Sequence, residues 1–328
     1  MRKKGLITWL GIALSVALLA WIVTKFDMKE ALDALARANP AWLVAGAVVY
    51  AGLFALRGWR WALLLKPIKK VSAGTAGEVF AIGFMANNIL PARLGDVARA
   101  FVLARREGIT AAGSFSSVML ERILDGVVVV LFLNVVLWVD PPAAPWIGKM
   151  SLIASAIFVG AVVVCGLIAW NERPVLTVAK RALFFASDSL KQKVFGLIVR
   201  LAEGLHSLKS LSRTLEVIAL SLLIWTIETS VYVLAGYAYG LEVPVLGMAL
   251  VMSVLTLGLS VPSGPGFVGV FEGLIIQAVG LYGIVGPDAV AYALSVHMIH
   301  FVPGTLLGLA FSWRSGLKLS ELGTAAEG

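Results

Sequence analysis

Hydrophobic residues fall in long continuous runs along most of the chain. Several runs reach or approach the roughly 20 residues that a helix needs to cross the hydrocarbon layer of a bilayer. Continuous runs also lack the alternation of a transmembrane β-barrel. We therefore predict an all-α, polytopic integral membrane protein. Its six full spans are expected at residues 6–25, 41–63, 112–138, 151–170, 214–239 and 288–312.

Two further apolar segments, 74–105 and 245–283, are interrupted near their middle by proline and glycine. Both breaks contain Pro-x-x-x-Gly, beginning at Pro91 and at Pro262. Paired breaks of this kind are typical of inverted repeats, in which discontinuous helices form a substrate site near the bilayer midplane. We predict two re-entrant helical hairpins. The alternative is that these residues only kink two ordinary helices, since both are common in membrane helices.

The loops predict an orientation. Basic residues precede the first span, and the loop 171–213 holds eight Lys and Arg against three Asp and Glu. Basic loops face the cytoplasm. We therefore expect a protein of the cytoplasmic membrane with both termini on the cytoplasmic side. The chain is then one membrane domain of two halves, 1–140 and 141–328. The hairpin 74–105 opens inward, and the hairpin 245–283 opens outward.

Leucine, valine and isoleucine recur at helical spacing within the basic loop, between residues 180 and 212. This pattern favours an amphipathic helix on the inner membrane surface, attracted by anionic lipid. A solvated connector helix is the alternative.

Composition supports the membrane assignment. Of the 328 residues 59% are apolar and 14% charged, whereas soluble domains are about 25% charged. The formal net charge of +8 comes from basic residues in loops between spans, so we expect no nucleic-acid partner. Cys165 is the one cysteine, which excludes an intramolecular disulfide.

Charged residues within the apolar segments are costly and usually face a partner or a wet cavity. The densest group is expected to line an inward-facing polar cavity, where arginines would hold a phosphate. The alternative is an ion-pair network that staples helices together. The group consists of Arg93, Asp96, Arg99, Glu121, Arg122 and Asp125.

Glu228 and Glu272 each stand alone in an apolar run. Burial favours the protonated form of a carboxyl group, so both are candidate proton carriers; otherwise each hydrogen-bonds a neighbouring helix. His297 and His300, three residues apart, are interpreted as buried, hydrogen-bonded histidines and less readily as a metal pair.

Four residues near the end of the second predicted span are interpreted as snorkelling and aromatic-belt anchors. They are Arg57, Trp59, Arg60 and Trp61.

Soluble-enzyme signatures are missing. Gly264 to Gly269 fits G-x-G-x-x-G, but its flanks are membrane segments rather than a βαβ unit. H-E-x-x-H, G-x-S-x-G and P-loop motifs do not occur. We expect no catalytic residue, metal or cofactor.

Three stretches resemble the lysylphosphatidylglycerol synthase transmembrane-domain family, the flippase-like region of the multiple peptide resistance factor. They run from Asn88 to Arg99, from Ser117 to Asp125 and from Pro262 to Glu272. The resemblance covers nearly the whole chain and includes stand-alone proteins without a synthase domain. It implies movement of a lipid between leaflets, and carried over by position it implies pocket residues at Arg93, Asp96, Glu121, Arg122, Asp125 and Glu272.

We therefore expect a flippase for a phospholipid or lipid-linked anionic substrate. The predicted substrate-binding residues are those of the charged group together with Pro262, Gly266 and Glu272. The chain ends about 16 residues after its last predicted span, so we do not expect synthase activity. Alternatives are a membrane-embedded lipid-modifying transferase and a non-catalytic scaffold of an envelope-lipid pathway. Lipids with anionic head groups are the expected partners, and a homo-oligomer is compatible with the sequence.

Overall fold

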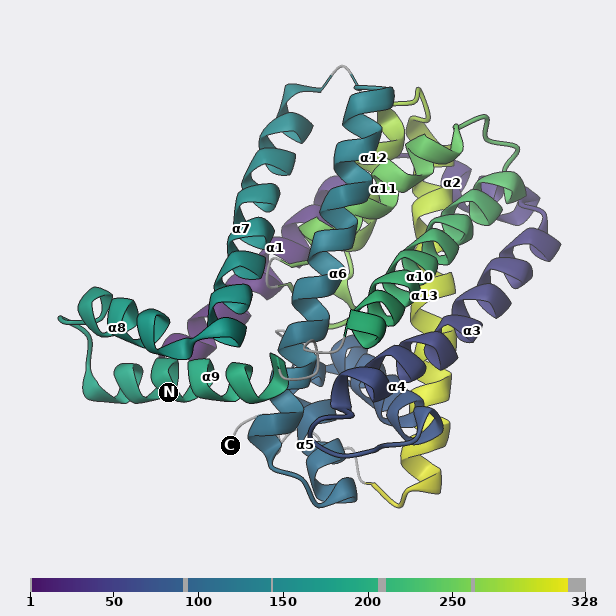
Figure 1. Cartoon of the computed structure of the whole chain (residues 1–328). Helices are drawn as coiled ribbons and strands as arrows, with labels where there is room; N and C mark the ends of the chain where they lie inside the picture. The colour runs from purple at the N-terminus through teal and green to yellow at the C-terminus, as the bar shows by residue number, and fades with distance from the viewer. Residues whose placement is uncertain (1, 91–93, 143, 206–210, 261–262, 318–328) are drawn as a thin grey trace.

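A computed structural model of the protein describes residues 2–90, 94–142, 144–205, 211–260 and 263–317. Within these ranges the chain is helical and has no strand, which confirms the all-α fold class (Figure 1). The helices are α1 (Arg2–Lys25), α2 (Met28–Arg37), α3 (Pro40–Leu65), α4 (Ala73–Ile89), α5 (Gly95–Glu107), α6 (Ala111–Val139), α7 (Pro145–Trp170), α8 (Glu172–Ala182), α9 (Asp188–Leu205), α10 (Leu211–Ala238), α11 (Val245–Gly258), the short 3-10 helix η3 (Pro265–Phe267), α12 (Val270–Gly280) and α13 (Gly286–Arg314).

Five described helices are long and apolar enough to cross a membrane, namely α3, α6, α7, α10 and α13. They correspond to five of the six predicted spans. The first predicted span differs, because α1 turns by 86° into α2. Asp27 causes α2 to begin there, since its carboxylate caps the amides of Lys29 and Glu30. A sixth span exists only if this bent pair is counted as one.

The predicted amphipathic helix at 180–212 is two helices. α8 ends at Ala182, α9 begins at Asp188 and ends at Leu205, and residues 206–210 lie outside the described ranges. α9 packs against α6 and α7. In Figure 1 the pair projects sideways from the end of α7. The single continuous helix was wrong at its start, because the apolar residues at helical spacing begin at Leu190, within α9, and the residues before Asp188 belong to a turn and to α8.

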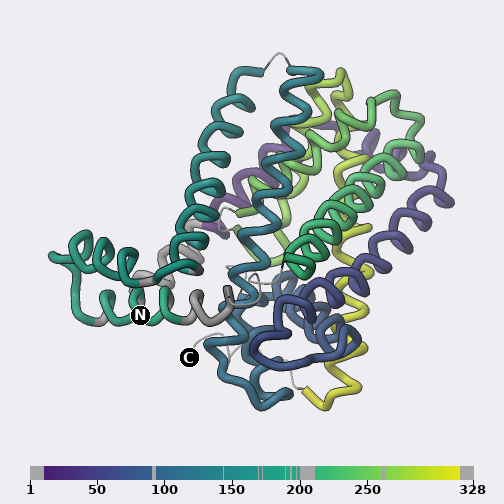
Figure 2. The backbone as a smooth tube through the Cα atoms, viewed as in Figure 1, coloured from purple at the N-terminus to yellow at the C-terminus, as the bar shows by residue number. Residues whose placement is uncertain are grey.

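The bundle is built on close helix contacts through small residues. α3 and α10 run side by side in opposite directions, as Figure 2 shows. α4 lies against α3 and α13. A Cβ atom added to Gly58 of α3 would lie 2.5 Å from the Cα atom of Gly77 on α4. Small residues allow backbones to approach in this way when lipid supplies no hydrophobic drive for association.

Both predicted broken segments are helix–break–helix units, formed by α4 with α5 and by α11, η3 and α12. In the first unit the side-chain oxygen of Asn87 accepts a hydrogen bond of 2.8 Å from the amide of Gly95, which fixes the start of α5. The two breaks meet, because η3 contacts α4 and a Cβ on Gly266 would lie 3.5 Å from the carbonyl oxygen of Asn88. The fold therefore brings together two breaks that are about half the chain apart.

Candidate functional site

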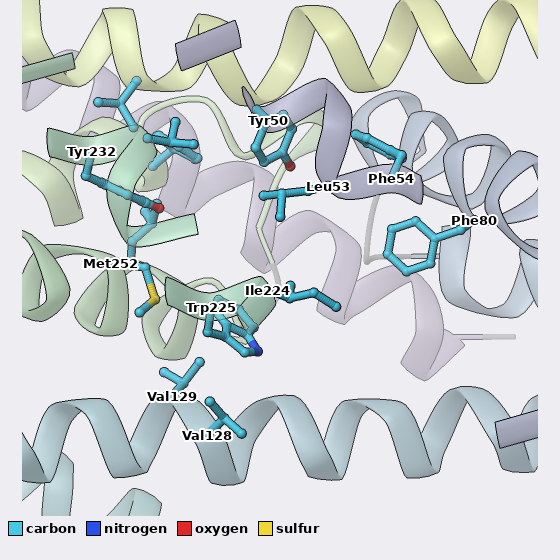
Figure 3. Packing of buried hydrophobic residues seen from close by; sticks show 14 of the residues in the cluster. Tyr50, Leu53, Phe54, Phe80, Val128, Val129, Ile224, Trp225, Tyr232 and Met252 are labelled. Carbon is cyan, nitrogen blue, oxygen red and sulfur yellow. The ribbon is translucent and has the colours of Figure 1, made fainter. Parts of the chain in front are cut away.

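A cavity of about 130 Å³ lies beside the two breaks. It is bounded by residues of α3, α4, α6, α10, α11, α12, α13 and the loop with η3. Aromatic side chains make up much of its wall, and Figure 3 shows four of them, Tyr50, Phe80, Trp225 and Tyr232, in the middle of the bundle. The polar and charged lining residues are Arg57, Asn87, Asn88, Arg122, Asp125, Glu228, Thr256, His297 and His300. An apolar wall with a few convergent polar groups is the usual character of a ligand site.

A buried ion network joins α3, α5 and α6 next to this cavity. Glu121 of α6 accepts hydrogen bonds from Arg60 at 2.9 Å and from Arg99 at 2.8 Å. Arg60 also donates to Asp125 at 2.7 Å. Glu121, Arg60 and Arg99 are at most 1% exposed. These three side chains have no route to a ligand, and they hold the helices together.

Arg122 occupies a different position. Its guanidinium donates two hydrogen bonds to the carboxylate of Asp96, at 2.6 and 3.1 Å. The Arg122 side chain is 34% exposed, against 1% for those of Arg60 and Arg99. Arg122 also lines the cavity. Among the arginines of the predicted cluster that the structure describes, it is therefore the one that can meet a bound group.

A second charged chain also lines the cavity. Arg57 of α3 donates to Glu228 of α10 at 2.7 Å, and the other oxygen of Glu228 lies 3.0 Å from Nε2 of His300 on α13. All three side chains line the cavity. Tyr50 lies against the His300 ring, with ring centroids 4.4 Å apart. This chain joins three of the long helices through buried polar contacts.

The second break is held by a third polar group. Nδ1 of His297 contacts a carboxylate oxygen of Glu272, and Nε2 of His297 lies 2.9 Å from the carbonyl oxygen of Gly266. The other oxygen of Glu272 accepts from the amide of Gly269 at 2.7 Å and caps α12. The backbone at this break is left-handed at Gly266 (φ 65°) and at Phe267 (φ 60°). For a phenylalanine this costs on the order of 1–3 kcal/mol, and such strain gathers at functional sites.

The structure therefore separates the predicted site residues. Arg122 and Asp125 line the cavity, and Gly266 and Glu272 form the break beside it. Asp96 supports Arg122, whereas Arg99 and Glu121 belong to the buried network. Arg93 and Pro262 lie outside the described residues.

The interpretation of the end of α3 as membrane anchors was wrong for three of its four residues. Arg57, Arg60 and Trp61 are buried, and the indole of Trp61 donates to Ser117 at 2.9 Å. Trp59 is exposed. A signal was present in the sequence, because apolar residues 62–65 follow Arg60 before the first lysine. An arginine followed by another turn of apolar residues is inside the span rather than at its end.

The two glutamates that stand alone in the sequence each bond to a neighbouring helix, which is the alternative given above to a proton carrier. Glu228 is bound by Arg57 and His300, and Glu272 by His297. The reading of both histidines as buried and hydrogen-bonded agrees with the structure. Among the described residues, no group of three or more His, Cys, Asp or Glu has a metal-binding arrangement.

Formal charges balance within the described network. Arg57, Arg60, Arg99 and Arg122 contact Asp96, Glu121, Asp125 and Glu228. Four cations against four carboxylates leave no net charge before the histidines are counted. A buried network of this kind needs every member, since removal of one partner leaves an unpaired charge in a dry site.

Comparison with known proteins shows a family match over most of the chain. The family described as "Lysylphosphatidylglycerol synthase TM region" matches residues 8–308. A protein from Haloferax volcanii named "Glycosyltransferase AglD" is 28% identical over 293 residues, which are 80% of this chain and 47% of that protein. This chain therefore spans about half the length of that relative. A "UPF0104 membrane protein" from Methanothermobacter thermautotrophicus is 24% identical over 98% of both chains.

Proposed function

Because the chain belongs to the lysylphosphatidylglycerol synthase transmembrane-region family, we propose that it moves a phospholipid or lipid-linked molecule with an anionic head group between the leaflets of the cytoplasmic membrane. The observation that carries this proposal is the cavity, with its convergent charged groups, at the meeting point of two broken helices. Irregular backbone is tolerated at membrane depth where protein or a wet cavity covers it. Broken helices that meet in this way form the substrate site of many transporters.

The size of the cavity supports a head-group site rather than a site for a whole lipid. Its volume of about 130 Å³ is close to that of an engineered cavity of ~150 Å³ that admits benzene. A phosphate-sized or similar polar group fits, and two acyl chains do not. In this proposal the head group crosses through the protein while the tails stay in the hydrocarbon layer.

Individual residues have distinct roles in the proposal. Arg122 binds the anionic oxygens through Nη1, because Asp96 takes only Nε and Nη2 of the guanidinium, Nη1 lies 3.8 Å from Asp125, and the side chain lines the cavity. Asn88 of α4 bonds Thr305 of α13 at 2.9 Å and holds the first break against that helix. The aromatic wall lowers the local dielectric constant, which strengthens the charged contacts.

The test is lipid translocation in vesicles that contain the purified full-length chain. Fluorescent lipids with anionic and zwitterionic head groups are placed in one leaflet, and their loss from it is followed with an impermeant quencher. We expect protein-dependent movement that prefers the anionic lipid and falls at least about tenfold in the Arg122→Gln variant, the loss that one charge-assisted contact of ~1.4 kcal/mol produces. Unchanged movement in that variant would remove Arg122 from the site.

Arg106→Gln is the matched control. Arg106 is also salt-bridged to one carboxylate, that of Glu78 at 2.8 Å, and its side chain is 38% exposed against 34% for Arg122, but it does not line the cavity. Its replacement should leave the lipid preference and rate unchanged. The relative named "Glycosyltransferase AglD" suggests the rival function, which is glycosyl transfer; in a membrane chain we would expect its acceptor to be a lipid. Formation of a glycosylated lipid without transbilayer movement would favour that function over ours.

A further inference from the structure

Two histidine–glutamate pairs lie one turn apart on the wall of the cavity, and their hydrogen-bond geometry fixes how many protons they hold. In the first pair, His297 faces Glu272 through Nδ1 and the Gly266 carbonyl oxygen through Nε2. In the second, His300 faces the Val296 carbonyl oxygen through Nδ1 at 2.7 Å and Glu228 through Nε2.

A neutral imidazole has one donor nitrogen and one acceptor nitrogen. A carbonyl oxygen accepts only, so the nitrogen that faces it must carry hydrogen in each pair. The remaining nitrogen then faces a carboxyl oxygen, and a proton has to lie between them, either on the imidazole or on the carboxyl group. Each pair therefore contains one proton more than a neutral histidine with a carboxylate.

Loss of that proton would change the structure at the second break. Two lone pairs would then face each other between His297 and Glu272, both at most 4% exposed. To relieve this, the imidazole must turn its hydrogen toward Glu272 and release the Gly266 carbonyl. Gly266 sits in the strained turn between α11 and α12, so its release frees the backbone that borders the cavity.

We propose that the Glu272–His297 pair is a proton-binding site that couples the lipid movement proposed above to a proton gradient. In the protonated state the pair clamps the turn at Gly266 onto α13; in the deprotonated state the turn is released and the cavity changes its access. The proton enters and leaves through the polar cavity, which His297 and His300 line. The second pair, Glu228–His300, lines the same cavity. The ring of Phe271 contacts both histidines, stacked on His297 with centroids 4.2 Å apart and edge-on to His300 at 5.7 Å.

Other charged and titratable groups around these pairs come from several helices. They are Arg57 and Tyr50 of α3, Arg122 and Asp125 of α6, and Tyr232 of α10. Arg57 already binds the second oxygen of Glu228. The first pair has the capping amide of Gly269 on its second carboxyl oxygen. Neutralising Glu228 would take this carboxylate away from Arg57. Glu272 is therefore the better of the two glutamates to replace with a neutral side chain.

Glu272→Gln imitates the protonated pair with little structural change. The glutamine oxygen can accept from the Gly269 amide, and its NH₂ group can donate to Nδ1 of His297. The variant should fold and keep the turn clamped, but it cannot release the proton. Glu242→Gln, an exposed change in the loop between α10 and α11, is the matched control.

The experiment uses full-length protein in vesicles with a one-unit pH difference across the membrane. For one proton per lipid, we expect the wild type and Glu242→Gln to build a lipid asymmetry of up to about tenfold, which a protonophore abolishes. Glu272→Gln, whose turn stays clamped, should exchange lipid far more slowly than the wild type at equal pH and build no asymmetry, while still eluting as the folded protein on gel filtration. Wild-type lipid that equilibrates equally with and without the pH difference overturns the coupling and leaves the proposed function standing. No lipid movement in the wild type overturns both.

A second measurement tests, without lipid transport, whether the turn at Gly266 is held against α13. Val268, 42% exposed beside the turn, is changed to cysteine in a Cys165→Ala background and alkylated at increasing pH. Relative to the same cysteine in the Glu272→Gln protein, which corrects for thiol ionisation, the rate should rise with pH. Equal pH profiles in the two proteins overturn the clamp.

Discussion

At the residue scale, burial decides which charges serve structure and which serve a ligand. Arg60 and Arg122 belong to the same ion network, but the first is 1% exposed and the second lines the cavity. The sequence shows both as arginines within apolar segments. Only the packing of three helices around Glu121 separates their roles, and no local pattern encodes that packing.

Arg60→Ala should strongly destabilise the protein, because it leaves Glu121 and Asp125 without their shared partner. Removing one member of a buried ion pair costs about 3–5 kcal/mol. The free energy of unfolding can be measured by titrating the detergent-solubilised protein with a denaturing detergent. Lys69→Ala is the control, since Lys69 is half exposed in its pair with Glu107 and its loss should cost about 0–1 kcal/mol. Equal losses in the two variants would contradict the structural role of the network.

At the scale of elements, glycine contacts fix how the first broken unit sits against the long helices. Gly58 and Gly52 lie on the same helix, α3, but a Cβ on Gly58 meets the backbone of α4 whereas one on Gly52 meets nothing within 4 Å. The pair offers a comparison in which helix propensity is the same and the contact differs.

Gly58→Ala should destabilise the protein by about 1–3 kcal/mol, the usual cost of overpacking. Gly52→Ala should be neutral or stabilising by up to ~1 kcal/mol, as alanine favours a helix over glycine. Thermal unfolding in one detergent compares the two directly. A Gly58→Ala protein as stable as Gly52→Ala would mean that α3 and α4 do not pack as closely as described.

The α8–α9 pair is expected to rest on the membrane surface. Phe184 and Phe185, 72% and 96% exposed, lie at its turn, close to Lys180 and Arg181. Exposed aromatic and basic residues of this kind suit an interface with anionic lipid. A fluorophore on a Phe185→Cys variant, with Cys165 replaced by alanine, should be quenched by spin-labelled lipid in nanodiscs, and more strongly with anionic lipid. Quenching no stronger than at a Glu242→Cys control would contradict this.

At the scale of the whole molecule, much of the fold was predictable because it rests on the length of apolar runs. Five spans and both broken units follow from hydropathy and from proline and glycine. The bend after α1 was not predicted, since Asp27 acts through a local cap that hydropathy does not register. His297 was not assigned to the site, because its partners Glu272 and Gly266 meet it through the break rather than through helical spacing.

The inverted-repeat arrangement and the placement of both termini in the cytoplasm remain predictions. They rest on the positive charge of the loops. Cysteines introduced into the loop 171–213 should react with an impermeant reagent from the cytoplasmic side only, and one at Glu242 from the opposite side only. Reaction of both from the same side would exclude this topology.

The central claim is that lipid head groups pass through the cavity between the two breaks. Thr256 lines that cavity, whereas Leu131 of α6 is exposed on the outside of the bundle. Each is changed to cysteine in a Cys165→Ala background and modified with a bulky thiol reagent, with labelling checked by mass, before lipid movement is measured in vesicles. We predict that modification of the Thr256→Cys protein stops movement and that modification of the Leu131→Cys protein does not. Equal movement through both fully labelled proteins would contradict the account.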